Sequence, residues 1–473
     1  MKHYLMTIDG ASVDSSEKFD VINPATEKAF ATCALGNDES VNQAVAAARA
    51  AFPAWSALPD SDRQNLMHAL GGVLEENMQE LVELVSLETG KPVKGMNDIG
   101  ATMELMGSIG WTHVTADLTL EEEVVKDDDS GKVVLLRKPL GVVASITPWN
   151  WPLLIAIWHI IAAMRTGNTV VIKPSENTPV ATARFVELAN TVLPKGVLNL
   201  VMGYGEVGAA LTAHDDVNKI VFTGSTPTGK KIMSSASGNL KRLVLELGGN
   251  DAAIVLPDAN PAELAPQIFG AAFHNNGQTC ACLKRLYVHE SIHDELCAEL
   301  VKLAEGVELG EGQNESTDLG PLQNREQLKI VEDLAALARE QGGEFLTGGE
   351  RLDRAGYFYK PTIVAGLSNG NSLVDLEQFG PILPVIKYSN VDEAVALAND
   401  NPNGLGGSVW SPDTKAAADI AARLECGTAW INSHGAVQPD VPFGGIKQSG
   451  VGVEFGRHGL EECTSLQALI VNK

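Results

Sequence analysis

The feature that most constrains this fold is a strict alternation of apolar runs and helical segments between Gly141 and Glu246. The expected strands are 141–146, 169–172, 197–201, 219–222 and 242–246, and the expected helices begin at Trp151, Pro179, Gly205 and Thr226. Strands and helices in strict turn predict right-handed crossovers and a parallel sheet covered on both faces. Ligands of such sheets bind at the carboxyl ends of the strands.

A second α/β series begins after Gly249. Its expected strands are 252–256, 285–288, 381–385, 407–410 and 427–431, with a helix over 415–424. The pattern before about residue 116 is helical, and one long stretch runs from Ser61 to Gly90. Residues 117–138 place acidic triplets beside β-branched runs, which is typical of exposed hairpin strands. We therefore expect two α/β domains and a small strand-rich third element.

Composition excludes several classes of function. A net charge of −25 on 473 residues that are 44% hydrophobic indicates a globular protein that does not bind nucleic acid or anionic membranes. Asp9 interrupts any signal peptide, and the most apolar stretch, 151–164, contains His159 and is shorter than the ~20 residues of a membrane span. Six cysteines without CxxC spacing favour a reducing, cytoplasmic location.

Cys280 and Glu246 are the residues most suited to chemistry. Cys280 follows a helical segment in the polar turn 275–282, where backbone N–H groups can stabilise negative charge. Glu246 ends the last parallel strand of the first series and precedes two glycines that permit close backbone approach. Taken alone, Glu246 fits a helix cap or an ion pair equally well.

Two glycine motifs could hold phosphate. Residues 203–208 and 222–226 both run from a strand into a helix, whose N-terminus favours an anion. The first motif lacks the acidic residue about twenty positions later that a standard dinucleotide fingerprint requires. Lys173 and Glu176 follow the second strand, where the carboxylate could accept from a ribose hydroxyl, although an ordinary capped loop explains them as well. Asn150 lies in a stiff aromatic turn, 148–152, that packing alone could also explain.

Together these motifs resemble the NAD(P)-dependent aldehyde dehydrogenase superfamily, in order and spacing, over essentially the whole chain. The matching segments are 148–152, 173–176, 222–226, 246–249, 277–280, 377–381 and 442–450. The resemblance implies a Rossmann-like cofactor domain with a parallel sheet (1–117 and 139–247) and a second α/β catalytic domain (248–448). It also implies a small β oligomerisation element (118–138 and 449–473) and a homodimer or homotetramer.

The resemblance also assigns catalytic roles. It implies that the Cys280 thiolate attacks an aldehyde to give a thiohemiacetal, and that loss of hydride to the cofactor leaves a thioester. Asn150 and the Cys280 N–H would hold the oxyanion. Glu246 would activate the water that hydrolyses the thioester, and Glu454 would relay its proton.

The implied cofactor is NAD, although members with Glu176 can also use NADP. Lys173 and Glu377 match ribose contacts, Glu176 the adenosine-ribose contact, Ser225 the pyrophosphate contact and Phe379 a nicotinamide wall. The full implied cofactor set is Thr147, Pro148, Trp149, Lys173, Ser175, Glu176, Gly205, Gly208, Phe222, Thr223, Gly224, Ser225, Leu247, Gly248, Glu377 and Phe379.

The implied aldehyde tunnel favours an apolar or aromatic substrate, because two of its members are tryptophans. Its members are Trp151, Trp158, Thr279, Ala281, His434, Val437 and Phe443. His434 either bonds a substrate hydroxyl or faces solvent. No tunnel residue is identified as the basic group that carboxylated semialdehydes require, although Lys284 and Arg285 are near in sequence. Cys282 resembles the partner cysteine that some semialdehyde dehydrogenases oxidise reversibly, and a quiet thiol is the alternative.

Other functions remain open at this point. A semialdehyde dehydrogenase or a CoA-acylating member would use the same cysteine, and the retained Glu246 favours hydrolysis over transfer to CoA. A cysteine–glutamate hydrolase without redox chemistry would not need the cofactor residues. A metal-binding protein using His274, Cys280, Cys282 and His289 is the weakest reading, because cysteines two residues apart poorly span a tetrahedral site.

Overall fold

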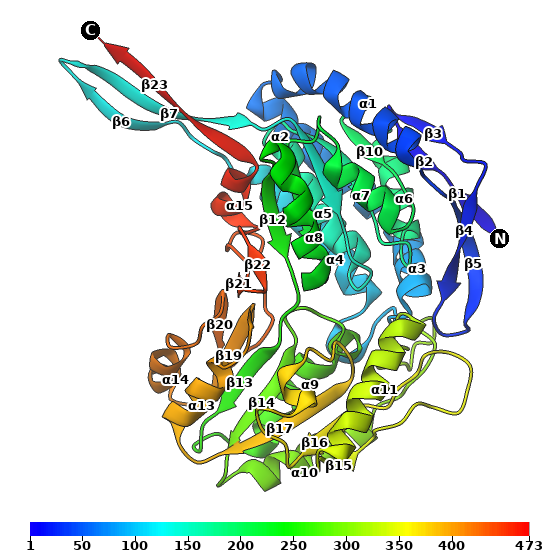
Figure 1. Ribbon diagram of the computed structural model, residues 1–473, viewed down its shortest axis with the longest axis vertical. Coiled ribbons are helices and arrows are strands. Elements are labelled where there is room, and N and C mark those ends of the chain that lie inside the picture. Colours follow the sequence, from blue (N-terminus) through cyan, green and yellow to red (C-terminus); the bar gives the residue numbers. More distant parts are fainter. Residues whose placement is uncertain (473) are drawn as a thin grey trace.

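The computed structural model describes residues 1–472 and contains two α/β domains and a projecting antiparallel sheet (Figure 1). The first domain is built on an eight-stranded sheet whose five central strands are parallel, in the order β12-β11-β8-β9-β10. These strands are β8 (Val142–Ile146), β9 (Thr169–Lys173), β10 (Leu198–Leu200), β11 (Lys219–Thr223) and β12 (Arg242–Glu246). The parallel sheet expected from the alternating pattern is therefore confirmed.

Short antiparallel strands extend both edges of this sheet. β22 (Gly450–Val451) pairs with β12, and β2 (Met6–Ile8) and β3 (Ala11–Val13) follow β10. A separate small sheet contains β1 (Lys2–Tyr4), β5 (Lys28–Ala34) and β4 (Lys18–Asn23). The helical expectation for the first 116 residues was wrong for residues 2–34. These strands are only three to seven residues long, too short to give a clear alternating pattern.

Helices pack around the first sheet. They are α1 (Asp38–Ser56), α2 (Asp60–Glu76), α3 (Met78–Thr89), α4 (Ala101–Asp117), α5 (Pro152–Arg165), α6 (Val180–Ala189), α7 (Gly205–Ala213) and α8 (Thr226–Ala236), with short 3₁₀ turns η1 (Met96–Asp98) and η2 (Ser237–Asn239). The long stretch from Ser61 is divided between α2 and α3 at Asn77, and it ends at Gly90, which is left-handed (φ 77°). Nearly all of α5 is buried.

The second domain is built on a seven-stranded sheet in the order β15-β16-β17-β14-β13-β19-β20, parallel except at β15. Its strands are β13 (Asp251–Val255), β14 (Leu283–His289), β15 (Glu344–Thr347), β16 (Thr362–Ala365), β17 (Ile382–Tyr388), β19 (Gly406–Trp410) and β20 (Thr428–Ile431). Its helices are α9 (Pro261–Phe273), η3 (His274–Gly277), α10 (His293–Glu305), α11 (Arg325–Glu340), α12 (Ser372–Asp375), α13 (Val391–Asn399) and α14 (Thr414–Ala421). All five strands expected for this domain are present.

The third element is a long antiparallel sheet of β6 (Glu123–Asp128), β7 (Gly131–Pro139) and β23 (Thr464–Asn472), which projects away from both domains (Figure 1). Before β23 the chain forms β18 (Asn403–Gly404), β21 (Ile446–Lys447) and α15 (Gly456–Glu462). Several apolar side chains of the projecting sheet are exposed, among them Val125, Leu466 and Ile470 (64%). Among the described residues, no helix is long and apolar enough to cross a membrane.

Candidate active site

Cys280 lies where two cavities meet. It lines one cavity of about 280 Å³ beside the first sheet and another of about 470 Å³ beside α4 and α5. The turn before it is unusual because Asn275, Asn276 and Gly277 all have positive φ (51°, 56° and 68°). Asparagine and glycine tolerate this conformation best, which explains the Asn-Asn-Gly sequence. The turn presents the partly exposed Cys280 to both cavities.

Asn150, the expected oxyanion donor, is hydrogen-bonded to the turn that precedes Cys280. Its side-chain amide donates to the Gln278 carbonyl (2.9 Å), and its own carbonyl accepts from Asn275 Nδ2 (3.0 Å). The next residue, Trp151, donates from its indole to Thr279 Oγ1 (2.9 Å). Asn150 belongs to the first domain and the turn belongs to the second, so these bonds join the domains at the reacting centre.

A buried ion pair supports Asn150 from behind. Lys91 Nζ donates to Glu104 Oε2 (2.5 Å) and to the Asn150 carbonyl (2.9 Å), and it lies 3.4 Å from the centre of the Trp151 ring. Glu104 Oε1 accepts from the N–H groups of Leu153 and Leu154, so a side chain from α4 caps the first turn of α5. Sequence reasoning missed both residues.

Glu246 is buried at the end of β12, and neither carboxylate oxygen has a hydrogen-bond partner. Burial, together with the nearby charge of Glu454, raises its pKa well above the usual value. Glu454 is also buried, which raises its pKa to about 8. Two carboxyl groups that oppose each other's ionisation form the kind of arrangement used for general acid–base chemistry. Glu246 lines neither cavity in this structure.

His159 continues this polar chain inward from Glu454. Its Nε2 lies 3.2 Å from Glu454 Oε1 and 3.1 Å from Thr223 Oγ1, and its Nδ1 lies 2.9 Å from Ser145 Oγ. Burial lowers the pKa of His159 to about 3, so the ring is neutral. The sequence held a signal for this residue, because His159 is the one polar interruption in the apolar stretch 151–164.

The smaller cavity contains most of the expected nicotinamide-side residues. Its lining includes Pro148, Trp149, Asn150, Thr223, Gly224, Ser225, Leu247, Gly248, Cys280, Glu377 and Phe379. Sequence reasoning missed two further lining residues, Gln327 and Ile330 of α11, which no local motif marks. A Cβ on Gly248 would lie 2.1 Å from Glu377 Oε2, so a larger residue there would displace that carboxylate. Ser225 caps α8, whose N-terminus faces this side and favours an anion.

The expected adenosine-side residues do not line this cavity but lie close to one another. Lys173 Nζ is 3.7 Å from Glu176 Oε2, and a Cβ on Gly208 would lie 3.5 Å from Lys173 Cδ. Thr147 N donates to the Lys173 carbonyl (3.2 Å). The expected nicotinamide-side and adenosine-side residues therefore lie along the same carboxyl edge of the sheet. Ser175 and Gly205 border this group in sequence, and Phe222 is buried with its ring against Gly224.

The larger cavity is lined mainly by apolar side chains. All seven expected tunnel residues line it: Trp151, Trp158, Thr279, Ala281, His434, Val437 and Phe443. Trp111 of α4, which sequence reasoning missed, stacks obliquely on Trp158 at 5.6 Å between ring centres. His434 directs Nδ1 at Ser408 Oγ (2.9 Å), whereas Nε2 has no hydrogen bond and lies 3.4 Å from Asp251 Oδ2. The His434 side chain is buried, so the alternative that it faces solvent was wrong.

Cys282, two residues after Cys280, is fully buried. Its sulfur lies 3.6 Å from His274 Nε2, and burial raises the pKa of its thiol to about 12. His289, which the metal-binding hypothesis also included, instead contacts Ser291 Oγ (2.8 Å). Within residues 1–472 no cluster of three or more potential ligands could hold a metal ion.

Comparisons with known proteins point to one family. The model of the aldehyde dehydrogenase family matches residues 12–469. The chain is 39% identical to betaine aldehyde dehydrogenase of Bacillus subtilis (strain 168), over 98% of this chain and 96% of the relative. It is also 39% identical to phenylacetaldehyde dehydrogenase of Pseudomonas fluorescens, over 98% and 95%.

Solved structures agree with this assignment. An NAD⁺ complex of aldehyde dehydrogenase from Bacillus cereus superposes with a TM-score of 0.96 at 33% identity, covering 99% of this chain and 96% of that one. Betaine aldehyde dehydrogenase from Staphylococcus aureus in complex with NAD⁺ gives 0.95 at 34% identity, covering 99% and 95%. The order of motifs, the two α/β domains and these matches have one explanation: the chain belongs to the aldehyde dehydrogenase family.

Proposed function

We propose that this protein oxidises apolar or aromatic aldehydes to carboxylic acids with NAD, through a covalent intermediate on Cys280. The observation that carries the proposal is the position of Cys280, which lines both the smaller cavity beside the first sheet and the larger apolar cavity, the proposed aldehyde tunnel. A nucleophile between two cavities can contact an aldehyde from one side and a cofactor from the other.

The first step is attack of the Cys280 thiolate on the aldehyde carbon, which forms a C–S bond and moves the carbonyl electron pair onto oxygen. The Asn150 amide carries two N–H groups, and its bond to Gln278 uses one of them. The second N–H and the Cys280 backbone N–H stabilise the oxyanion, which is charged only after attack.

The smaller cavity suits a nicotinamide cofactor. Gly248 has no side chain, so a cofactor can approach the main chain beside Glu377. The rings of Phe379 and Trp149 form an aromatic wall, with ring centres 5.4 Å apart. The N-terminus of α8 suits a pyrophosphate. NAD, when bound there, accepts the hydride from the thiohemiacetal carbon. Glu176 beside Lys173 favours NAD over NADP, because its carboxylate repels a 2′-phosphate. NAD⁺ in the complexes of the related enzymes supports this choice.

Glu246 completes the reaction as the general base. It takes a proton from the water that attacks the thioester carbon, and Cys280 leaves as the thiolate while the carboxylic acid forms. Both Glu246 oxygens lack partners, but they lie outside both cavities, so the side chain must turn towards Cys280 to contact that water. A raised pKa makes this carboxylate a stronger base than an exposed one. Glu454, whose charge acts on Glu246, receives the proton next when it is ionised, above its pKa of about 8.

The tunnel supports a neutral, apolar substrate. Its lining includes Trp111, Trp151, Trp158 and Phe443, and none of its lining residues within 1–472 is Lys, Arg, Asp or Glu. A carboxylated semialdehyde would therefore lose its hydration without gaining a cationic partner. Of the two named relatives, phenylacetaldehyde dehydrogenase has a substrate whose ring matches this apolar lining, and the aromatic faces would also attract the quaternary ammonium of betaine aldehyde, which is therefore the competing substrate. The cofactor cavity favours oxidation over the hydrolase alternative.

The experiment follows reduced nicotinamide by absorbance with NAD⁺ and then NADP⁺, across phenylacetaldehyde, hexanal, betaine aldehyde and succinate semialdehyde, with Cys280→Ala as the blank. We expect NAD⁺-dependent turnover, fastest with phenylacetaldehyde and absent in the blank. Trp158→Ala should raise the KM for phenylacetaldehyde more than the KM for acetaldehyde, because it removes only the distal aromatic contact. Preference for succinate semialdehyde would contradict the substrate proposal. Ester cleavage without any aldehyde turnover would contradict the oxidation proposal and favour the hydrolase.

We also propose that the projecting sheet of β6, β7 and β23 joins subunits into a homodimer or homotetramer. Exposed apolar side chains on an edge strand support this assignment, because such a strand offers unpaired backbone groups to a partner. A cytoplasmic location is proposed on the six cysteines, all of which are free thiols.

A further inference from the structure

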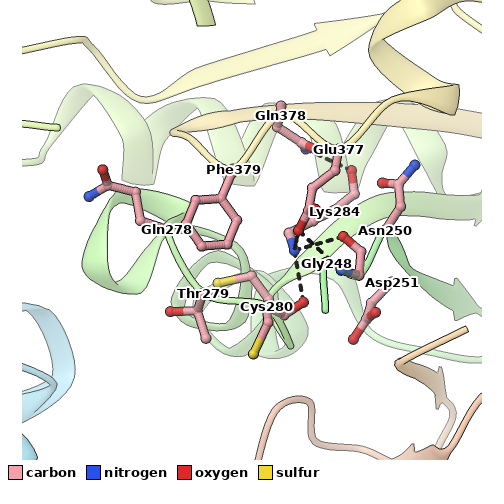
Figure 2. Close-up of polar contacts among 12 residues, drawn as sticks. Gly248, Asn250, Asp251, Gln278, Thr279, Cys280, Lys284, Glu377, Gln378 and Phe379 are labelled. Atoms are coloured by element: carbon pink, nitrogen blue, oxygen red, sulfur yellow. Dashed lines mark hydrogen bonds and ion pairs between the residues drawn. The ribbon is translucent and has the colours of Figure 1, made fainter. Parts of the chain in front are cut away.

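A fully buried lysine beside the nucleophile has no part in the steps above. Lys284, the second residue of β14, is 1% exposed. Its ammonium donates to the Cys280 carbonyl (2.8 Å), the Gly249 carbonyl (2.9 Å) and Glu377 Oε1 (2.6 Å). Figure 2 shows Lys284 between Glu377 and the Cys280 main chain, with the Phe379 ring alongside. Because burying a cation is costly, an ammonium that bonds three separate segments of the chain calls for an explanation.

The sequence makes room for these bonds at two glycines. A Cβ on Gly249 would lie 2.6 Å from the Cys280 carbonyl, and a Cβ on Gly248 would overlap Glu377. Because neither glycine has a side chain, the Gly249 carbonyl and the Glu377 carboxylate can both contact the Lys284 ammonium. The arrangement therefore depends on Lys284 and on the Gly-Gly pair that follows Glu246.

The charges that face Cys280 are mostly negative. Glu246, Asp251 and Glu377 all disfavour the thiolate, and Lys284 is the cation that opposes them. Burial is the largest effect and raises the pKa of the Cys280 thiol to about 12. Burial also opposes the charge on Lys284, but Glu377 and Asp251 raise the pKa of its ammonium above the usual value, so it stays protonated.

We propose that Lys284 is the positioning residue of the nucleophile: its ammonium fixes the Cys280 main chain and supplies the positive charge that makes the thiolate attainable. Glu377 then sets how much of that charge Cys280 experiences, because it shares the ammonium. The inference rests on the proposed role of Cys280 as the nucleophile. It predicts opposite effects for the two members of the ion pair.

The test is the rate of Cys280 alkylation by iodoacetamide from pH 7 to pH 10, without cofactor, with mass spectrometry to locate the label and Cys280→Ala as the blank. Only the thiolate reacts, so a pKa change of one unit changes the rate about tenfold below the pKa. We expect Lys284→Met to lower the rate at least about tenfold at pH 8. Glu377→Gln should raise it, because the same ammonium is then no longer neutralised.

Arg285→Met is the matched control. Arg285 is the neighbouring cation on β14 and equally buried (2% exposed), but it points to the other face of the strand, where it bonds the Asn250 and Ala398 carbonyls. Its loss should leave the alkylation profile unchanged even if the protein becomes less stable. If Lys284→Met does not fold, Lys284→Gln and Glu377→Gln still give the two opposite directions.

Equal alkylation profiles in the native protein and Lys284→Met, or slower alkylation in Glu377→Gln, would overturn the inference. An Arg285→Met profile that moves as far as that of Lys284→Met would do the same, because the effect would then be general loosening. Failure of the proposed function gives a different result. In that case Cys280→Ala would still oxidise aldehydes, whatever the alkylation rates.

Discussion

Lys91 offers the sharpest test of how the oxyanion site is held, and the change is Lys91→Met. The ammonium makes one charge-assisted bond to the Asn150 carbonyl, a kind of bond worth about 1.5–3 kcal/mol. At about 1.4 kcal/mol per factor of ten, losing its full value would lower kcat/KM by about 10-fold to 150-fold. Asn275 Nδ2 remains bonded to the same carbonyl, so we expect the lower end of this range, about tenfold.

The assay is a double-mutant cycle on kcat/KM for phenylacetaldehyde. Asn150→Ala alone should cost about 10²-fold to 10³-fold, the usual cost of losing one oxyanion donor. If Lys91 acts through Asn150, then Lys91→Met should change kcat/KM less than about threefold in the Asn150→Ala background. Lys94 is exposed and lies on the same loop, so Lys94→Met should leave kcat/KM unchanged in both the native and the Asn150→Ala protein.

Stability must be separated from positioning, because removing one partner of a buried ion pair costs about 3–5 kcal/mol. The variant Lys91→Met/Glu104→Gln has no unpaired buried charge, and its amide oxygen can still accept from Leu153 and Leu154. We expect it to recover most of the thermal stability but not kcat/KM. Recovery of both, or an equal loss from Lys91→Met with and without Asn150, would refute the reasoning.

Three further outcomes follow from the same geometry. Glu454→Gln removes a charge that raises the pKa of Glu246, so the acid limb of the pH profile for p-nitrophenyl acetate hydrolysis should move to lower pH; a move to higher pH would contradict the coupling. Ile470→Glu, which places charge on the exposed edge strand, should lower the mass measured by light scattering, and an unchanged oligomer would exclude this surface as the interface. If Cys282 forms a disulfide with Cys280, Cys282→Ala should abolish the recovery of activity by a dithiol after peroxide treatment. The same recovery in Cys282→Ala and in the native protein would show that Cys282 takes no part in the oxidation.

The parallel sheets could be predicted because their strands are short continuous apolar runs between clear turns. Lys219–Thr223 is buried throughout, and such a run can be predicted to be a strand without knowing which strands pair with it. The strands of residues 2–34 could not be recognised in this way. Within β4, buried Phe19 and Val21 alternate with exposed residues over only six positions, and the pairing with β5 that stabilises it is not visible locally.

The residues of the candidate site likewise fall into those that a local motif predicts and those that it does not. Cys280, Glu246, Asn150 and the cofactor residues occur in contiguous motifs, so sequence alone could suggest them. Lys91, which lies 59 residues from the Asn150 carbonyl it bonds, belongs to no such motif. Its role depends on a contact between distant segments, and its chemistry there also depends on burial, which lowers the pKa of Lys91 while the charge of Glu104 opposes that effect.

The two lysines lead to one view of the reacting centre. Lys91 bonds the Asn150 carbonyl from the first domain and Lys284 bonds the Cys280 carbonyl from the second, on the two sides of the proposed oxyanion site. Both ammonium groups are almost fully buried and each is balanced by one carboxylate, Glu104 or Glu377. Since the domains meet through Asn150 and Gln278, a shift between them changes donor and nucleophile together. Activity should therefore fall under mild denaturant before either domain unfolds, because the oxyanion site needs both domains in register.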